Sequence, residues 1–107
     1  MKKNINPAKL AARANIFKAL AHPTRLSIIE YLSEREHCVC ELLDKIDADQ
    51  TTVSKHLSLM KNAGVLECDR RGTMVFYRLK MKCVAGFLGC VDKSLQATAK
   101  AHLETVL

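Results

Sequence analysis

Apolar residues in the first third of the chain recur every three or four positions, the spacing of helices that bury one side. The first stripe consists of Leu10, Ala14, Phe17 and Leu20. It follows Asn6-Pro7, and Asn at the N-cap with Pro at the first helical position is a favourable helix start. A second start at His22-Pro23 precedes the stripe Leu26, Ile28, Ile29 and Leu32. The pattern predicts two successive helices.

The middle of the chain predicts two further helices joined by a tight turn. The third helix is expected over residues 39–46 and the turn over residues 47–49, with Asp49 as the next N-cap. The fourth helix is expected from Gln50 to about residue 63, where Gly64 supplies a left-handed stop. Its inward positions are Val53, Leu57 and Met60, and its other side is polar.

The pattern then changes to that of strands. Residues 65–68 and 74–79 are rich in β-formers and flank the polar stretch 69–73, which predicts a hairpin. The apolar face of the second strand consists of Val75, Tyr77 and Leu79. A last helix is expected over residues 82–104, with the stripe Val84, Phe87, Leu88, Val91 and Leu95. Four helices, a β-hairpin and a fifth helix predict a mainly α (α+β) winged helix-turn-helix domain that spans residues 1–107.

The charge of the chain is concentrated in one stretch. The chain has 107 residues and a net charge of +6, and residues 50–80 contain six basic and two acidic side chains. This local excess indicates a polyanionic partner. No apolar run approaches the roughly 18 residues that a membrane span needs, and the first ten residues lack the apolar segment of a signal peptide. We therefore expect no membrane association.

The polar face of the fourth helix and the hairpin tip suit contacts with double-stranded DNA. The side chains expected at base edges of the major groove are Gln50, Thr51 and Thr52. Those expected at phosphates are Ser54, Lys55, His56 and Lys61, and those expected at the backbone or minor groove are Arg70 and Arg71. Any one of them alone is more typical of a solvated surface. Their order, charge and spacing together indicate DNA binding.

Three stretches resemble the ArsR/SmtB family of repressors. The first comprises residues 20–26 (LAHPTRL) and 28–32 (IIEYL). The second comprises residues 49–57 (DQTTVSKHL) and 61–66 (KNAGVL). The third comprises residues 71–72 (RG) and 77–79 (YRL). The resemblance covers about residues 10–95. It implies a homodimer paired through the first and last helices, bound to operator DNA and released by a metal or a thiol-reactive effector. The apolar stripes of those two helices fit such pairing and equally fit the core of a monomer.

Cysteines are the candidate sensing residues. There are five, an odd number, with no secretion signal, which favours reduced thiols in the cytoplasm over a disulfide framework. Cys38 and Glu41 have the spacing of a capping box at the start of the third helix, with Cys in place of Ser or Thr. Thiol is a poor cap, and a broken local rule often marks a functional site. A helix N-terminus also favours the thiolate, which binds metals.

The pair Cys38 and Cys40 resembles the arsenic-sensing branch, whose cysteines stand at i, i+2 and i+5. Leu43 occupies the third position here, so a third thiol must come from elsewhere or the site differs. Cys90, and less so Cys83, are the candidates, including from the other subunit. They lie about 10 Å apart along one helix, so at most one joins a given site. Cys68 is expected in the core.

The spacing of the pair suggests how binding reaches the DNA. Residues i and i+2 of a regular helix point roughly 200° apart, so both sulfurs share an ion only if the first turn unwinds or lies outside the helix. Because the third helix packs against the fourth, binding would reorient the DNA-reading helix. A coupling of about 1–3 kcal/mol is typical of linked sites.

The identity of the effector stays open among soft, thiol-seeking species. Trivalent arsenic or antimony, cadmium, lead and mercury all suit thiolates, and no organic cofactor is expected. A zinc pattern is not reproduced by Asp92 and His102, and His37 is expected to be a solvated loop residue. A redox or persulfide sensor is the first rival. The chain lacks the C-x-x-C motif that is typical of a thiol oxidoreductase, so we expect no enzyme. A winged-helix protein-interaction module would not explain the basic face.

Overall fold

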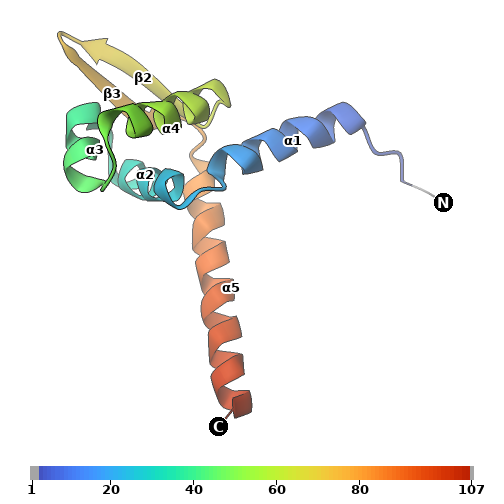
Figure 1. Ribbon diagram of the computed structural model, residues 1–107. Coiled ribbons are helices and arrows are strands. Elements are labelled where there is room, and N and C mark those ends of the chain that lie inside the picture. Colours follow the sequence, from blue (N-terminus) through green and yellow to red (C-terminus); the bar gives the residue numbers. More distant parts are fainter. Residues whose placement is uncertain (1–2, 107) are drawn as a thin grey trace.

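The computed structural model describes residues 3–106. The elements are α1 (Pro7–Leu20), α2 (Pro23–Glu34), β1 (His37–Cys38), α3 (Val39–Lys45), α4 (Gln50–Asn62), β2 (Leu66–Arg71), β3 (Met74–Leu79) and α5 (Cys83–Val106). Of these, α2, α3 and α4 pack against a three-stranded antiparallel sheet, from which α1 and α5 extend away (Figure 1). The predicted order of helices and hairpin is confirmed. β1 is an addition that the pattern did not predict.

The helix starts follow the predicted capping residues. The side chain of Asn6 accepts a hydrogen bond from the amide of Ala8 at 3.0 Å, and His22 Nδ1 accepts one from the amide of Thr24 at 3.1 Å. Each precedes a proline at the first helical position, where no amide hydrogen needs a partner. Gly64, after the end of α4, has a φ of +86°, the left-handed conformation that suits glycine.

The sheet has the order β1-β3-β2, so β3 lies at its centre. β1 pairs with β3 through His37↔Tyr77 and Cys38↔Phe76. The predicted hairpin is confirmed, but β2 continues through Arg71, so its turn is confined to Gly72 and Thr73. Cross-strand pairs as far as Arg71↔Met74 extend the hairpin. The β2–β3 hairpin, which is the wing of this fold, is therefore paired up to its turn.

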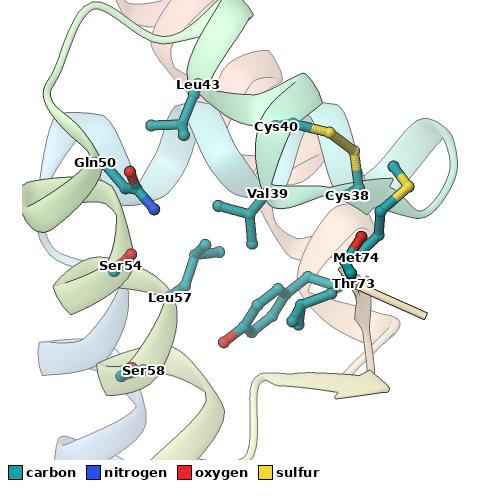
Figure 2. Close-up of a pocket in the computed structure, with 12 residues that line it drawn as sticks. Cys38, Val39, Cys40, Leu43, Gln50, Ser54, Leu57, Ser58, Thr73 and Met74 are labelled. Carbon is teal, nitrogen blue, oxygen red and sulfur yellow. A yellow bond between two sulfur atoms is a disulfide. The ribbon is translucent and has the colours of Figure 1, made fainter. Parts of the chain in front are cut away.

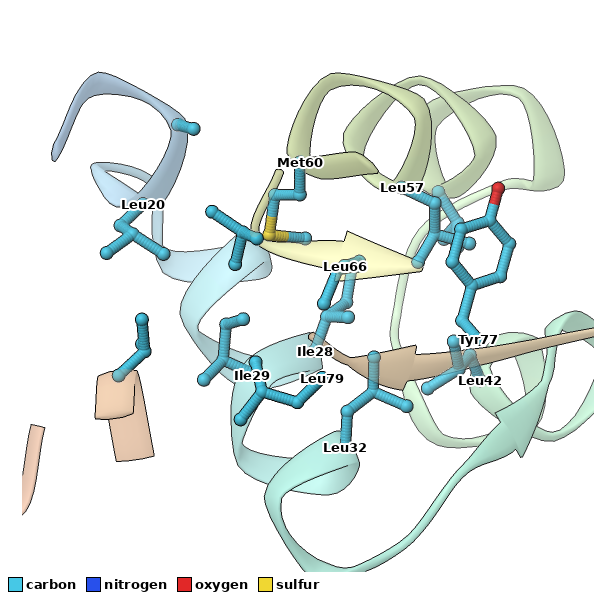
Figure 3. Packing of buried hydrophobic residues seen from close by; sticks show 14 residues of the cluster. Leu20, Ile28, Ile29, Leu32, Leu42, Leu57, Met60, Leu66, Tyr77 and Leu79 are labelled. Carbon is cyan, nitrogen blue, oxygen red and sulfur yellow. The ribbon is translucent and has the colours of Figure 1, made fainter. Parts of the chain in front are cut away.

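The core lies between α2, α3, α4 and the sheet (Figure 3). Its fully buried side chains come from each of these elements: Ile28, Ile29, Leu42, Val53, Leu57, Met60 and Leu66. Tyr77 and Leu79 enter it from β3, as the predicted alternation requires. The core thus fixes α3 and α4 against one another and against the wing.

α1 and α5 extend away from this core in different directions (Figure 1). Their apolar stripes are buried at Leu20 and Val84, next to the core, but other positions stay exposed in one chain: Leu10 is 47%, Phe17 55%, Phe87 47% and Leu95 62% exposed. The rings of Phe17 and Phe87 lie edge to face with centroids 5.8 Å apart. Beyond Leu20 and Val84, these stripes therefore lie outside the buried core of the single chain. Within residues 3–106, no helix is long and apolar enough to cross a membrane.

Candidate nucleic-acid interface and thiol site

The outer face of α4 is polar, basic and exposed. Asp49 caps the helix, since its Oδ1 accepts a hydrogen bond from the amide of Thr52 at 2.7 Å. This bond and the neighbouring lysine lower the pKa of Asp49, with the backbone bond as the larger cause. The exposed side chains that follow are Gln50, Thr51, Thr52, Ser54, Lys55, Ser58 and Lys61. The structure thus places the predicted DNA-contacting residues of this helix on one open surface, apart from His56.

His56 lies on the side of α4 that packs against α1 and α2. Its Nδ1 accepts a hydrogen bond from Arg25 Nε at 3.0 Å, and its ring centroid is 4.5 Å from that of His22. Arg25 also donates to the carbonyl of Lys18 at 3.1 Å. Burial, and then the neighbouring His22 and Arg25, lower the pKa of His56. The prediction that His56 faces outward with Lys55 is therefore wrong, because this side of α4 is covered by the α1–α2 junction.

The two wing arginines differ in their surroundings. Arg70 is exposed, whereas the Arg71 guanidinium donates to both carboxylate oxygens of Glu36, at 2.6 and 3.0 Å. Arg71 also donates to Asp69 at 3.0 Å and lies over the ring of Phe76, 4.4 Å from its centroid. These carboxylates raise the pKa of Arg71, Glu36 first. Arg71 thus ties the wing to the segment before β1.

Cys38 and Cys40 meet at the start of α3. Cys38 is the N-cap in extended conformation, and a disulfide joins its sulfur to that of Cys40. The predicted capping box is confirmed: Cys38 Sγ accepts from the Glu41 amide at 3.3 Å, and Glu41 Oε1 accepts from the Cys38 amide at 3.1 Å. Because Cys38 lies outside the helix, the two sulfurs converge. Cys38 is buried and Cys40 is exposed.

Glu41 is held by charge as well as by the cap. Its Oε2 accepts a hydrogen bond from Arg35 at 2.6 Å. This bond, and next the bond from the Cys38 amide, lower the pKa of Glu41 to about 2. The carboxylate is thus ionised at neutral pH and completes the capping box.

His37 is buried rather than solvated, so that prediction is wrong. Its exposed fraction is 0%, because β1 brings it under Tyr31 and opposite Tyr77. Lys45 Nζ lies 2.8 Å from Nε2, and the Arg35 carbonyl lies 3.0 Å from Nδ1. An ammonium group only donates, so we assign Nε2 as acceptor and Nδ1 as donor. Both ring nitrogens of His37 are occupied, which leaves none for a metal ion.

The other cysteines lie apart from this pair. Cys68 is half-buried opposite Tyr77, next to the core, as predicted. Cys83 begins α5 and Cys90 follows two turns later, and both are exposed. In the part of the chain that the structure describes, no three His, Cys, Asp or Glu side chains form a possible metal site. Neither Cys83 nor Cys90 of the same chain therefore completes a site with Cys38 and Cys40.

An open cavity of about 620 Å³ adjoins the two sulfurs, between α3, α4 and the wing (Figure 2). Its apolar wall consists of Val39, Leu43, Leu57, Val75 and Tyr77. Its polar rim consists of Gln50, Ser54 and Ser58, which belong to the outer face of α4. The sequence pattern did not reveal this cavity, because its lining comes from three segments whose relative position only the fold determines. One space thus connects the cysteine pair with Gln50, one of the predicted base-reading residues.

Comparisons with known proteins agree with this architecture. The family model described as bacterial regulatory protein, arsR family, matches residues 22–67. The chain is 37% identical over 86 residues to an uncharacterised HTH-type transcriptional regulator of Methanocaldococcus jannaschii, covering 79% of this chain and 97% of the relative. It is 39% identical over 80 residues to the arsenical resistance operon repressor of Escherichia coli, and the match covers 74% of this chain and 68% of the relative.

Two further similarities differ in what they cover. The chain is 42% identical over 67 residues to the cadmium resistance transcriptional regulatory protein CadC homolog of Staphylococcus aureus. This match covers 62% of the chain and 55% of the relative, so the chain spans just over half of the relative's length. The solved homodimeric winged helix-turn-helix DNA-binding domain of Mycobacterium bovis, a possible ArsR-family regulator, superposes with a TM-score of 0.75. It is 32% identical, with 97% of this chain and 94% of that chain covered.

Proposed function

The chain belongs to the ArsR family of DNA-binding helix-turn-helix transcriptional regulators, which are not enzymes, and we propose that it is a homodimeric repressor released from its operator by a soft, thiol-seeking effector. Trivalent arsenic or antimony is the effector that we propose first. Cadmium, lead or zinc is the alternative, because relatives of similar identity are named for arsenical and for cadmium resistance. The cytoplasm is the proposed location.

The proposed DNA-binding surface is the outer face of α4 with the wing. Gln50, Thr51 and Thr52 stand at the exposed start of α4, where a recognition helix contacts base edges. The proposed phosphate contacts are Ser54, Lys55, Lys61 and Arg70. His56 and Arg71 are proposed to act indirectly, because His56 packs against Arg25 and Arg71 is paired with Glu36.

The proposed dimer forms through α1 and α5. Their exposed leucine and phenylalanine side chains make an apolar surface that a single chain leaves in water. The homodimeric state of the Mycobacterium bovis domain supports the same assembly here. A twofold dimer presents two copies of α4 to two half-sites, which suits a pseudo-palindromic operator.

One observation carries the sensing proposal: the two sulfurs meet at the N-cap of α3, beside a cavity that α4 helps to line. Two thiolates at one point supply two ligands for a soft ion. The third coordination position is open to a thiol of the partner subunit, for which Cys90 or Cys83 is the candidate, or to a group from outside the protein.

Two structural roles of Cys38 connect the sulfur pair to the DNA-binding surface. Cys38 Sγ is the acceptor that caps α3, so an effector that binds this sulfur acts directly on the first turn of α3. The backbone of Cys38 also pairs with Phe76 of the wing. Effector binding therefore acts on α3 and on β3 at once, and both contact the DNA-reading surface. Population of a second arrangement of α3 lowers the affinity for operator.

The test uses reduced protein and an operator duplex selected in vitro for binding to it. We expect Cys40→Ser to bind this duplex as the wild type does and to remain bound when arsenite is added. Cys68→Ala, which alters a thiol outside the site, is the matched control and should still be released. Release of Cys40→Ser by arsenite at the wild-type concentration would contradict the proposed site.

A redox-sensing repressor is the second candidate, and the Cys38–Cys40 disulfide favours it. Formation of this bond from two thiols transfers two electrons to a peroxide or disulfide oxidant and releases two protons. If it is the physiological signal, the oxidised protein should lose its operator with no arsenical present and regain it on addition of dithiothreitol. Equal operator affinity of the oxidised and reduced forms would reject this candidate.

A further inference from the structure

The net positive charge of the chain comes entirely from its first 29 residues. Residues 1–29 contain six basic and no acidic side chains, whereas residues 30–107 contain eleven of each. The basic stretch 50–80 is offset mainly by residues 30–49, which contain seven acidic and two basic side chains. The net charge therefore resides around α1 and the start of α2, and a local field of this sign attracts a polyanion.

The basic side chains of α1 differ from those of the wing in their pairing. Arg71 and Arg78 on the wing are each paired with two carboxylates. By contrast, Lys9, Arg13 and Lys18 on α1 are exposed, and within residues 3–106 none of them forms an ion pair. Release of the counterions of a nucleic acid by unpaired cations of this kind drives binding to its backbone. The cations of α1 thus remain available for phosphate contacts.

Three cations gather near the start of α1. Lys3, Lys9 and Arg13 line one open hollow of about 390 Å³. Because Lys9 and Arg13 are four residues apart, they share one side of the helix. The apolar stripe that contains Leu10 and Phe17 lies next to this side. Pairing of two chains through the stripe therefore places the cations beside the dimer interface rather than within it.

The length of α1 matches the distance from a half-site to the centre of an operator. The last residue of α1, Leu20, is buried in the core. Arg25 fixes this end of α1 to α4, since it donates to the Lys18 carbonyl and to His56 Nδ1. From Leu20 back to Lys9 the helix rises about 16 Å. The half-sites of a twofold dimer lie roughly 34–36 Å apart, so each is about 17 Å from the twofold axis.

The position of α1 in the fold suits a contact with the same DNA. In Figure 1, α1 and α4 lie at the same end of the molecule, and α5 extends away from both. Because α1 belongs to the proposed dimer interface, which lies on the twofold axis, its basic start reaches the region between the two half-sites. There the cations of both chains come together, and a polyanion relieves their mutual repulsion.

We propose that the basic side of α1, formed by Lys3, Lys9 and Arg13, binds the phosphate backbone of the operator between the two half-sites. The inference rests on the proposed function, because it requires a twofold dimer on operator DNA, and it adds a binding surface to α4 and the wing. Contacts to phosphates carry no sequence information. α1 therefore contributes affinity and salt dependence, and α4 supplies the choice of sequence.

The first measurement compares Lys9→Gln/Arg13→Gln with the wild type on the selected operator duplex, by fluorescence anisotropy at several salt concentrations. Each lost phosphate contact reduces the slope of log affinity against log salt by about 0.9, so the slope should fall by about 2 for each chain. Affinity near 0.1 M salt should fall at least about tenfold. The matched control, Lys93→Gln/Lys100→Gln, removes the same charge from exposed positions of α5 and should change neither quantity. Equal losses in both double variants would trace the effect to net charge and overturn the inference.

Uncharged linkages then locate the contact on the DNA. Methylphosphonates replace the phosphates between the half-sites in one duplex and those at the outer edges of the half-sites in a second duplex. The wild type should lose affinity on the central replacement, whereas Lys9→Gln/Arg13→Gln should lose little more, because its contact is already absent. The outer replacement should weaken both proteins alike. An equal loss for both proteins on the central replacement would overturn the inference.

A charge-conserving variant separates a contact from a structural effect. Lys9→Arg/Arg13→Lys keeps both charges and should retain the wild-type salt slope, and a slope as low as that of Lys9→Gln/Arg13→Gln would overturn the inference. Wild-type operator binding by Lys9→Gln/Arg13→Gln overturns this inference alone, and weaker binding of that variant to vesicles of phosphatidylglycerol and phosphatidylcholine would then assign the helix to an anionic lipid surface. A wild-type protein that binds no selected duplex overturns the proposed function as well.

Discussion

The two helices of the helix-turn-helix, α3 and α4, differ in how much of each lies in the core and in how each begins. α3 buries Leu42 alone, whereas α4 buries Val53, Leu57 and Met60. α4 begins with a carboxylate, Asp49, that accepts from the third residue of the helix at 2.7 Å. α3 begins with a sulfur, Cys38, in the same role at 3.3 Å. The two helices therefore differ in their caps as well as in their packing.

This difference assigns separate tasks to the two helices. A carboxylate cap is strong and chemically inert, which suits a helix that must hold its side chains ready for DNA. A sulfur cap is a weaker acceptor, and it can form bonds to a soft ion or to a second sulfur. α3 can thus be altered by a ligand at its first residue while the core keeps it in place. Glu41 and Arg35 support this weaker start from outside.

The largest expected effect comes from removing one buried leucine from each of the two helices. Leu42→Ala and Leu57→Ala each delete a fully buried side chain, and each should lower the free energy of unfolding by about 2–5 kcal/mol. Urea unfolding at a fixed protein concentration measures the loss. Leu59→Ala, at a position on α4 that is 40% exposed, is the control and should change little. A loss for one buried leucine only would mean that the other does not support the core as its burial indicates.

The second effect concerns the outer faces. Lys55→Ala on α4 should weaken binding to all DNA sequences several-fold and reduce the slope of log affinity against log salt by about 1, because one phosphate contact is lost. Asp44→Ala on α3, also exposed, is the matched control and should not lower the affinity. Fluorescence anisotropy at several salt concentrations gives both quantities. An unchanged slope for Lys55→Ala would place the DNA elsewhere.

The third effect compares two replacements of the sulfur cap. Serine keeps an acceptor for the Glu41 amide and alanine does not, so Cys38→Ala should be less stable than Cys38→Ser by about 1 kcal/mol. Both should lose the response to thiol-seeking effectors. Denaturant unfolding under reducing conditions checks the first statement. Equal stability of the two variants would show that this cap contributes nothing to α3.

The smallest effect is the pH dependence of the same cap. The pKa of Glu41 is lowered from 4.5 to about 2, so its carboxylate stabilises the folded protein fully above pH 4.5 and loses this effect as the pH falls to about 2. The difference in Tm between wild type and Glu41→Gln should therefore close over this interval. Asp44→Asn, on the same helix, is the control. A Tm difference that is constant from pH 6 to pH 2 would contradict the assigned role of Glu41.

The sequence predicted what depends on neighbouring residues. The caps Asn6, His22 and Asp49, the stop at Gly64 and the cysteine capping box are all local patterns, and the structure confirms each of them. The condition that Cys38 lie outside the helix for both sulfurs to meet was also available from helical geometry, because residues two apart point in different directions.

The remainder depends on contacts between distant segments. β1 has two residues and no strand pattern of its own, and it exists because β3, almost forty residues later, pairs with it. The burial of His37 follows from this pairing. His56 is covered by Arg25 from α2, which no spacing within α4 reveals. The apolar stripe of α1 could serve a monomer core or a partner until the structure left Leu10 and Phe17 exposed.

Reciprocal coupling is the most direct test of the central claim, that occupation of the Cys38–Cys40 thiols weakens the hold of α4 on DNA. If the effector lowers operator affinity by a given factor, operator must lower effector affinity by the same factor. Isothermal titration of arsenite into the reduced protein, alone and saturated with operator, measures it. The account predicts weaker binding in the complex by the factor seen in DNA release, roughly 5- to 150-fold for a typical coupling. Equal affinity in the two states would contradict it.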